Sequence, residues 1–569
     1  MLKENKTSVA ELRKFLKDNK ANAIMIAHDD EFQSENLSPD KERLAFVTGF
    51  TGSAGLAIVT PKKAVLFVDG RYVTQAKQQT DFEVLQVPQQ TTVSEWLSLF
   101  LKENHVVLYD PWVHTIAQIQ RWTEIFEKRG ALLAPCVRNP VDDFWEDRPL
   151  PREVLSYDYP ISYAGKTTSQ KISPIVKSFK LLGIDAFVVS NPDTVSWILN
   201  RRSNADRYTP VYRDRLIIME NGDVRSFPLS KEEMEEGLFG KVVGLDVYET
   251  PVKIKQMITD AGASVRTMEN PFKTAQIITN KVELYGMEEA ALTDSVAVCK
   301  TLAWMKNNVL HADELTIPAQ LIHFRKAHPL YKGESFPAIS AVGKNAAIVH
   351  YIPNKKTCKD FKGQSLYLLD TGAQYMNGTT DMTRTIALSE KVPELARQRY
   401  TEVLKGHIAL ARAVFPEGTI GAFLDGLARQ FLNLSEVDYD HGTGHGIGCY
   451  SNVHETPPSI SPHSRTEIKE GMVLSNEPGF YLPGRFGIRI ENMMQVKKAN
   501  TGKKKLLRFE MMTFVPFCYE LIDKDLLTYD EKKWISSYYM EIAKKVYPHL
   551  NKQDKVWLKG ELSKWTDQV

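Results

Sequence analysis

The residues best suited to chemistry lie between positions 441 and 491, in a stretch that opens H-G-T-G-H-G-I-G and closes G-I-R-I-E-N. Five of its side chains can bind metal ions or move protons: His441, His445, His454, Glu477 and Glu491. Upstream, Asp370 and Asp381 supply two more carboxylates in the stretch L-L-D-T-G-A-Q-Y-M-N-G-T-T-D-M-T-R-T. Together these residues predict a single catalytic or metal-binding site.

The two glutamates are predicted to face each other across a β-hairpin. If residues 483–485 form a three-residue loop, Leu482 pairs with Phe486, and the same register places Glu477 opposite Glu491. Directly opposed residues have Cβ atoms about 4.5 to 5.5 Å apart. That spacing suits carboxylates that bridge two metal ions about 3.5 to 4 Å apart.

The two aspartates fit a hairpin less simply. Their separation has the right parity for opposite positions, but the pivot then falls at Tyr375-Met376, two positions before the obvious turn residues Asn377-Gly378. We therefore expect a bulge or a strong twist in this hairpin.

Four clustered carboxylates would repel one another and raise each other's pKa values. Two divalent cations would cancel that charge, and oxygen donors with one imidazole suit Mn, Fe, Co or Zn at an open hydrolytic site. The alternating glycines of H-G-T-G-H-G favour a strand or loop, so one of His441 and His445 is expected to bind metal while the other points elsewhere.

Composition limits the other function classes. The chain has 569 residues, of which 43% are hydrophobic, so it can bury large cores and should form about three or four domains. Lys and Arg (72) nearly balance Asp and Glu (70), so neither nucleic acid nor a membrane is an expected partner. The five cysteines show no C-x-x-C spacing, and neither an export signal nor a membrane span is apparent, which favours a cytoplasmic protein.

Two copies of one α/β fold are predicted before the site, over residues 1–158 and 159–272. In the first, Ser8 is expected to cap a helix that leads to a strand over 22–27; in the second, Ser173 is expected to cap a helix over 175–182 that leads to a strand over 185–190. The two helix starts lie 165 residues apart, which is natural for a duplicated domain.

The third predicted domain covers residues 273–569 and contains every candidate ligand. It should begin with a long amphipathic helix over 281–307. In its C-terminal extension, residues 507–569, Thr528 and Glu531 are expected to cap a helix whose Trp534, Tyr538 and Ile542 pack in a core or a dimer contact. The fold class is therefore α/β (α+β).

Several motifs resemble, in order and spacing, those of the pita-bread metallopeptidases: L-L-D-T-G-A-Q-Y, T-T-D-M-T-R-T, H-G-T-G-H-G-I-G, N-V-H-E, N-E-P-G-F-Y and G-I-R-I-E-N. With F-V-T-G-F-T-G-S-A-G and V-D-G-R-Y near the N-terminus, nearly the whole chain resembles the three-domain cytosolic Xaa-Pro aminopeptidases (aminopeptidase P). The resemblance implies two related creatinase-type N-terminal α/β domains followed by a pita-bread catalytic domain with a C-terminal helical extension.

The resemblance also implies roles for individual residues. The ligands of two divalent metal ions, most often Mn²⁺ with Zn²⁺ or Co²⁺ as alternatives, would be Asp370, Asp381, His445, Glu477 and Glu491. Substrate-orienting and proton-shuttling roles would fall to His350, His441 and His454, with Arg489 beside the last glutamate.

The implied reaction removes the N-terminal residue from peptides whose second residue is proline. A metal-bridged hydroxide would attack the carbonyl before proline, Glu477 would accept the water's proton, and His454 or His350 would stabilise the oxyanion. A homodimer is also implied.

Three other functions are found on the same fold. A prolidase, which cleaves Xaa-Pro dipeptides, shares the ligand set, but two N-terminal domains and the long C-terminal extension favour the aminopeptidase. A non-catalytic pita-bread binding module should have lost ligands, and creatine amidinohydrolase lacks the metal set. The five intact residues argue against both.

Overall fold

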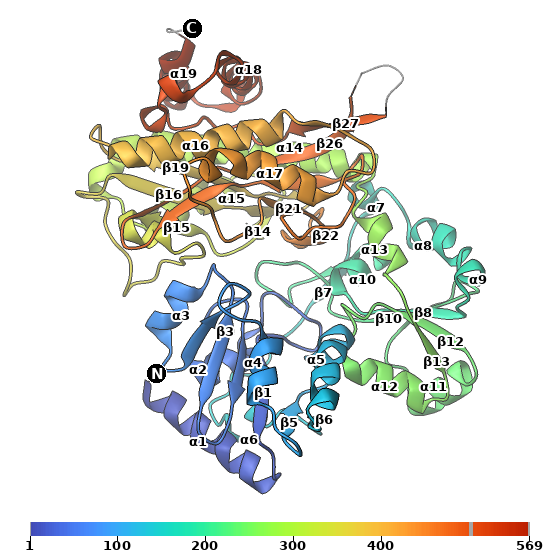
Figure 1. The fold of residues 1–569 in the computed structure, drawn as a ribbon. Coiled ribbons are helices and arrows are strands. Elements are labelled where there is room, and N and C mark those ends of the chain that lie inside the picture. Colours follow the sequence, from blue (N-terminus) through green and yellow to red (C-terminus); the bar gives the residue numbers. More distant parts are fainter. Residues whose placement is uncertain (1, 500–504, 567–569) are drawn as a thin grey trace. The chain divides into compact units, whose positions relative to one another are not determined.

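The computed structural model describes residues 2–499 and 505–566, and the chain divides into two compact units (Figure 1). Unit 1 comprises Met1–Ile161, Lys166–Asp206 and Val211–Ala275, and unit 2 comprises Ser162–Gly165, Arg207–Pro210 and Gln276–Val569. Unit 1 holds both predicted N-terminal domains, and the boundaries at 158/159 and 272/273 stay predictions.

Unit 1 begins with a six-stranded sheet in the order β4-β3-β2-β1-β5-β6. Its strands are β1 (Ala23–Ala27), β2 (Leu56–Val59), β3 (Ala64–Val68), β4 (Glu83–Gln86), β5 (Val106–Tyr109) and β6 (Leu132–Pro135). Its helices are α1 (Leu2–Asp18), α2 (Arg43–Thr48), α3 (Val73–Gln79), α4 (Val93–Phe100), α5 (Ile116–Lys128) and α6 (Val141–Phe144). Alternate residues of β1 enter different cores, so this strand is buried on both faces.

A second, five-stranded sheet in unit 1 has the order β11-β10-β8-β12-β13. Its strands are β8 (Ala186–Val189), β10 (Leu216–Met219), β11 (Val224–Ser226), β12 (Val242–Leu245) and β13 (Ser264–Thr267). The helices around it are α8 (Thr168–Val176), α9 (Phe179–Leu182), α10 (Pro192–Leu199), α11 (Lys231–Leu238), α12 (Val252–Asp260) and α13 (Pro271–Gln276). The short helix α7 (Ile161–Ala164) precedes them in the chain, and its residues from Ser162 on belong to unit 2. β7 (Ser156–Asp158) pairs separately with β9 (Arg201–Ser203).

The two sheets of unit 1 repeat one fold, as the sequence predicted. In each, the first strand is antiparallel to the strand of a following hairpin and parallel to a later strand. One side-chain hydrogen bond is also repeated. Just before β1, the Asn22 side chain accepts from the Val106 N–H of β5 at 2.8 Å, and just before β8 the Asp185 side chain accepts from the Val242 N–H of β12 at 2.7 Å. The predicted strands over 22–27 and 185–190 are confirmed as β1 and β8.

Both predicted helix starts in unit 1 are wrong. Ser8 lies inside α1, which already includes Leu2. In the second domain Thr167 caps α8 together with Gln170, and Pro174 lies inside that helix. Both segments contain further helix-forming residues upstream, so the predicted capping serine was not the first available start.

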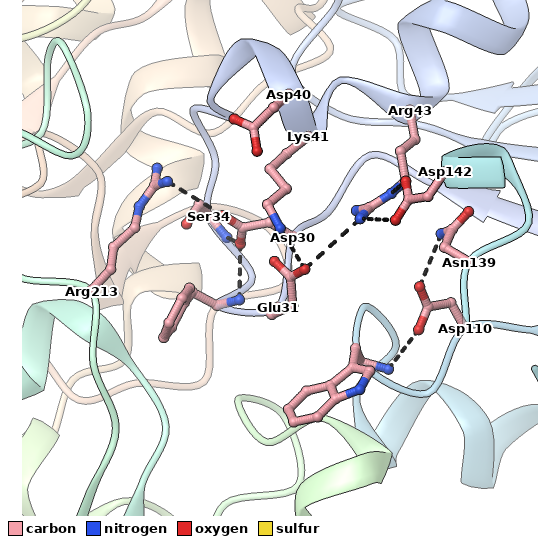
Figure 2. Close-up of polar contacts among 12 residues, drawn as sticks. Asp30, Glu31, Ser34, Asp40, Lys41, Arg43, Asp110, Asn139, Asp142 and Arg213 are labelled. Carbon is pink, nitrogen blue, oxygen red and sulfur yellow. Dashed lines mark hydrogen bonds and ion pairs between the residues drawn. The ribbon is translucent and has the colours of Figure 1, made fainter. Parts of the chain in front are cut away.

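Charged side chains fix the loops that follow β1 and β5 in unit 1 (Figure 2). Arg43 forms a bidentate pair with Asp142 at 2.7 and 2.9 Å, and Lys41 contacts Glu31 at 2.7 Å. Arg213, from the second domain, lies 3.7 Å from the buried Asp30. The first two contacts hold the first domain together, and the Arg213–Asp30 pair connects the two domains of unit 1 through side chains.

Unit 2 combines several antiparallel sheets with long helices. Its sheets have the strand orders β14-β17-β18, β15-β16-β19, β20-β27-β26-β23-β21-β22 and β24-β25. The strands are β14 (Tyr331–Glu334), β15 (Ile339–Val342), β16 (Leu366–Thr371), β17 (Ala373–Tyr375), β18 (Gly378–Thr379), β19 (Met382–Ala387), β20 (Val414–Pro416), β21 (Gly444–Gly446), β22 (Glu455–Ile460), β23 (Val473–Asn476), β24 (Gly479–Leu482), β25 (Phe486–Arg489), β26 (Asn492–Lys498) and β27 (Leu506–Met511).

The long helices of unit 2 are α14 (Lys281–Asn308), α15 (Thr316–Lys326), α16 (Glu394–Ala411), α17 (Gly421–Asn433), α18 (Tyr529–Lys545) and α19 (Lys552–Thr566). The first four, α14 to α17, pack against its strands, and α18 and α19 lie beyond them against α14 and α16 (Figure 1). The long helix predicted over 281–307 is confirmed, and so is the cap formed by Thr528 and Glu531. Tyr538 and Ile542 of α18 are buried in the largest core, where Trp534 packs against them. No helix among the described residues combines the length and apolar character needed to cross a bilayer.

A buried ion-pair network supports the hairpin that carries the two candidate aspartates. Arg325 is completely buried and forms a bidentate pair with Asp294 at 2.7 and 2.9 Å, and it also contacts Glu334. The same guanidinium donates to the Thr371 hydroxyl at 2.9 Å, and Asp294 accepts from the Thr380 hydroxyl at 2.9 Å. The network therefore contacts the chain on both sides of the hairpin turn.

Replacing Arg325 should destabilise unit 2 strongly. Arg325→Met leaves Asp294 and Glu334 buried without their cation, and breaking a buried pair typically costs about 3 to 5 kcal/mol. Denaturant unfolding monitored by tryptophan fluorescence measures the loss. The control is Arg412→Met, which removes a largely exposed pair with Asp530 and should cost about 1 kcal/mol or less. Equal midpoints for the two variants would contradict the prediction.

Candidate metal centre

The two glutamates lie opposite each other, between the β23–β26 ladder and the β24–β25 ladder. The two ladders have the same register. On one side Asn476 pairs with Asn492, and on the other Gly479 pairs with Arg489, so the register predicted from the loop at 483–485 is confirmed. At the glutamates themselves the strands separate. The Glu477 N–H donates to the Thr443 carbonyl at 2.8 Å, and the Glu491 N–H donates to the Thr383 carbonyl at 3.1 Å. Each glutamate is thereby also held by a third segment of the chain.

The two aspartates lie diagonally on one hairpin. Of the two distortions expected there, a bulge or a strong twist, the register shows no bulge. Asp370 pairs with Thr383, and the register continues unbroken to Tyr375 and Gly378, so the turn is at Met376-Asn377. The direct opposition considered for Asp370 and Asp381 is therefore wrong by two positions. Gly372 lies between β16 and β17, and an added Cβ there would lie 2.1 Å from the Thr380 carbonyl oxygen, so only glycine fits.

His445, and not His441, lies among the carboxylates. Its Nε2 is 3.4 Å from Asp381 Oδ2 and 3.4 Å from Glu477 Oε1. Its Nδ1 lies 2.9 Å from the Gly446 carbonyl, which fixes the tautomer and leaves Nε2 available as a ligand. Ligand atoms of Asp381, His445 and Glu491 all lie within 4.8 Å of one another. The strand pairing of β21 shifts just after His445, which turns this side chain toward the site.

The other three histidines predicted for the site are His454, His441 and His350. His454 precedes β22, and its ring lies 4.4 Å from the His445 ring at an angle of 87°. His441 Nε2 lies 2.9 Å from the Tyr481 hydroxyl. His350 directly follows Val349, whose carbonyl accepts from Arg489 at 3.5 Å. His454 thus lies beside His445, His441 is connected to Arg489 through Tyr481, and the main chain just before His350 contacts Arg489. The role of His350 stays a prediction.

Arg489 is buried and connects three parts of the site. It forms an ion pair with Asp370, donates to the Tyr481 hydroxyl, and donates to the Thr383 hydroxyl at 3.2 Å. Thr383 in turn donates to Glu491 Oε2 at 2.7 Å. Arg489, the last residue of β25, and Glu491, in the link to β26, therefore both contact the Thr383 hydroxyl. Their predicted place on one strand face stays a prediction, because Glu491 lies outside the two strands.

Two residues of the site, Tyr481 and Thr383, were not predicted from the sequence. Tyr481 joins His441 to Arg489, and Thr383 joins Arg489 to Glu491. A signal existed for Thr383, because it lies two residues after Asp381 and therefore on the same face of its strand.

The carboxylates have raised pKa values because they are buried close together. Burial is the main cause for Asp370, Glu477 and Glu491, and repulsion from neighbouring carboxylates adds to it. The pKa of Asp370 rises to about 7 even though Arg489 acts to lower it. Burial lowers the pKa of His445, but Asp381 and Glu477 outweigh that effect and raise it to about 9.

The donor set fits divalent metal ions. Three buried carboxylate oxygens have no hydrogen-bond donor: Asp370 Oδ1, Asp381 Oδ1 and Glu491 Oε1. Buried anionic oxygens without a donor are costly, and a cation is the partner that removes this cost. Four carboxylates and one neutral imidazole are the donors expected of Mn, Fe, Co or Zn at a hydrolytic site.

Comparison with known families agrees with the architecture. Residues 9–136 and 147–309 each match a model of the Creatinase/Prolidase N-terminal domain. Residues 285–498 match metallopeptidase family M24, and residues 505–564 match the C-terminal region of peptidase M24. The predicted fold class, with two creatinase-type domains before a pita-bread domain and a C-terminal extension, is confirmed.

Individual relatives match from end to end. A probable Xaa-Pro aminopeptidase P from Pyrenophora teres f. teres is 36% identical and covers 97% of this chain and 92% of its own length. A probable Xaa-Pro aminopeptidase P from Paracoccidioides brasiliensis is 35% identical over 97% of this chain and 98% of its own. The crystal structure of X-prolyl aminopeptidase from Caenorhabditis elegans, a cytosolic enzyme with a di-nuclear active site, superposes with a TM-score of 0.92 at 30% identity, covering 98% of this chain and 99% of that one.

Likeness of this extent, joined to the carboxylate and histidine arrangement described above, places the chain in the Xaa-Pro aminopeptidase P family of M24 metallopeptidases.

Proposed function

We propose that this chain is a metal-dependent aminopeptidase that removes the N-terminal residue from peptides with proline at position two. The observation that carries the proposal is the convergence of Asp370, Asp381, His445, Glu477 and Glu491 on one buried site. The likeness to relatives named for this activity supports it. These five residues would hold two divalent metal ions, for which we propose Mn²⁺, with Zn²⁺ or Co²⁺ as alternatives.

The metal ions, when bound, would polarise the substrate carbonyl and lower the pKa of a water molecule. The chain's own residues do the rest. Glu477 accepts the proton of the attacking water and passes it toward the prolyl nitrogen as the peptide bond breaks. His454 donates a hydrogen bond to the oxygen that gains negative charge, since its ring lies beside that of His445. Arg489 holds the Asp370 carboxylate in place.

Two further histidines would position the substrate. His441 is fixed by the Tyr481 hydroxyl, which Arg489 also contacts. Its ring is therefore coupled to Asp370 through two hydrogen bonds and the Arg489–Asp370 ion pair. His350 is proposed to orient the peptide or to share the stabilisation of the oxyanion.

We also propose a cytoplasmic homodimer that acts on peptides. The Caenorhabditis elegans relative, described as cytosolic, supports the location. The near balance of positive and negative side chains supports the view that neither nucleic acid nor a membrane is a partner.

Turnover of matched peptides tests the activity. A Xaa-Pro-Xaa tripeptide should release its first amino acid, a Xaa-Pro dipeptide should be cleaved far more slowly, and exhaustive chelation should abolish both reactions until Mn²⁺ is restored. Faster cleavage of the dipeptide would identify a prolidase. Undiminished turnover by metal-free protein would refute the metal-dependent mechanism.

Substitution of the two adjacent histidines separates ligand from accessory roles. His445→Ala should lose bound metal, because its Nε2 is the imidazole nitrogen that lies among the carboxylates. His454→Ala should retain both ions, yet turnover should fall by about 10² to 10³, the usual loss for an oxyanion donor. Elemental analysis and tripeptide kinetics on both variants give the result, and metal loss from His454→Ala alone would reverse the assignment.

Metal affinity should rise with pH. In the metal-free protein Asp370, with a pKa of about 7, and His445, with a pKa of about 9, both hold protons at low pH and must release them to bind metal. Between these two values at least one proton competes, so Mn²⁺ affinity should increase about tenfold per pH unit, and more steeply below about 7. Calorimetric titration at about pH 6 and about pH 8 checks the slope. An affinity independent of pH would contradict it.

A further inference from the structure

The C-terminal region surrounds a buried arginine that contacts the backbone of a proposed metal ligand. Arg384 follows Thr383 on β19 and is 1% exposed. Toward the site, its Nη1 donates to the Glu491 carbonyl and its Nη2 donates to the Asn492 side chain, each at 2.7 Å. Arg384 therefore holds both Glu491 and the residue after it.

The other side of the same guanidinium faces the region that follows β27. Its Nε donates to the Pro516 carbonyl at 3.2 Å, and its Nη2 donates to the Val515 carbonyl at 2.8 Å and contacts the Tyr538 hydroxyl at 3.1 Å. The Phe517 ring lies 5.0 Å from the guanidinium carbon. The C-terminal region thus supplies four of the groups around this side chain.

These neutral partners matter because Arg384 is buried without a carboxylate partner among the described residues. A buried cation is costly unless hydrogen bonds replace its water. Carbonyl oxygens, a phenol and an aromatic face provide that replacement here. The position of the guanidinium is therefore set by where the C-terminal region places those groups.

Tyr538 is the part of this cage that α18 contributes. Its hydroxyl also accepts from the Val515 N–H at 3.2 Å and donates to the Thr513 carbonyl at 3.0 Å. The Tyr538 hydroxyl therefore contacts Arg384 and also holds residues 513–515 in place. This is the segment whose Val515 carbonyl accepts from Arg384.

We propose that Tyr538 is a positioning residue for the metal centre and that the C-terminal region acts on the site through Tyr538 and Arg384. The proposal rests on the proposed role of Glu491 as a metal ligand. Thr383 fixes the Glu491 carboxylate and Arg384 fixes its main chain, so both ends of this residue are held by consecutive residues of β19. Loosening Arg384 lets Glu491 move relative to the other ligands.

A purely structural role for Tyr538 predicts a different result, and the chain offers a matched control. Tyr539 is the next residue of α18 and is 2% exposed, against 5% for Tyr538. Its hydroxyl donates to the Phe517 carbonyl at 3.2 Å. Tyr539→Phe therefore removes one hydrogen bond from an equally buried hydroxyl, but this hydroxyl has no hydrogen bond to Arg384.

The test is a titration of the metal-free, full-length protein with Mn²⁺, together with thermal unfolding of each variant. Tyr538→Phe should weaken the weaker Mn²⁺ site by about tenfold, the lower end of the usual effect of residues that support ligands. Tyr539→Phe should lower thermal stability by a similar amount and leave Mn²⁺ affinity within about twofold, since removal of a hydrogen bond remote from the ligands changes only folding. Saturating Mn²⁺ should restore turnover of Tyr538→Phe to near the wild-type value.

The other possible results would overturn either the inference or the proposed metal site. Unchanged Mn²⁺ affinity in Tyr538→Phe overturns the inference, and so does an equal loss in both variants, because that loss would follow stability alone. Wild-type protein that binds no Mn²⁺ would instead refute the proposed metal site. Arg384→Lys adds a second measurement, and if that variant folds it should lose more affinity than Tyr538→Phe because lysine has three donors in place of five.

Discussion

Repulsion among four clustered carboxylates, three of them buried, is the constraint on which the rest of unit 2 depends. Two unit charges about 4 Å apart repel by about 4 kcal/mol at an effective dielectric constant of about 20. A few such pairs would cancel the net stability of a typical domain, which is about 5 to 15 kcal/mol. Arg489 pairs with Asp370, and His445 lies against Asp381 and Glu477. These two groups leave Glu491 without a cationic partner in the described residues, which is the electrostatic reason for divalent ions.

The fold meets this constraint by bringing the ligands from several strands and from the short links between them. Asp370 lies in β16 and His445 in β21, whereas Asp381, Glu477 and Glu491 lie directly between consecutive strands. Ladders on either side hold Glu477 and Glu491 in register, a hairpin holds Asp370 and Asp381, and a separate strand carries His445. Contacts behind the strands then connect them. His407, buried in α16, lies 3.1 Å from the Asn476 carbonyl and 3.2 Å from the Asn492 side chain, and so joins the two strands next to the glutamates. The ligands are therefore set by the packing of whole elements.

The sequence could predict those parts of the site that depend on short-range geometry. The Glu477 and Glu491 pairing follows from a loop of fixed length, and the two-residue spacing placed Arg489 near Glu491, with which it shares the Thr383 hydroxyl. The aspartate hairpin was harder to predict. Its turn residues are Met376-Asn377, but the neighbouring pair Asn377-Gly378 is the much stronger turn signal in the sequence.

Contacts between distant segments could not be predicted. Nothing near Tyr538 in the chain indicates that its hydroxyl meets Arg384, which is 154 residues away. The helix starts in unit 1 failed for a different reason. A capping pattern is only four residues long, and more than one such pattern was available, as Thr167 and Gln170 demonstrate.

The register shared by the two ladders around the glutamates has an evolutionary consequence. Because β23 and β26 pair on their own, they align Glu477 with Glu491 whatever the length of the loop between β24 and β25. Insertions or deletions at 483–485 would act first on the two-stranded β24-β25 ladder, which carries Tyr481 and Arg489. This loop is thus a position where descendants of the chain can gain or lose residues, and so alter what lies beside the ligands, without displacing the two glutamates.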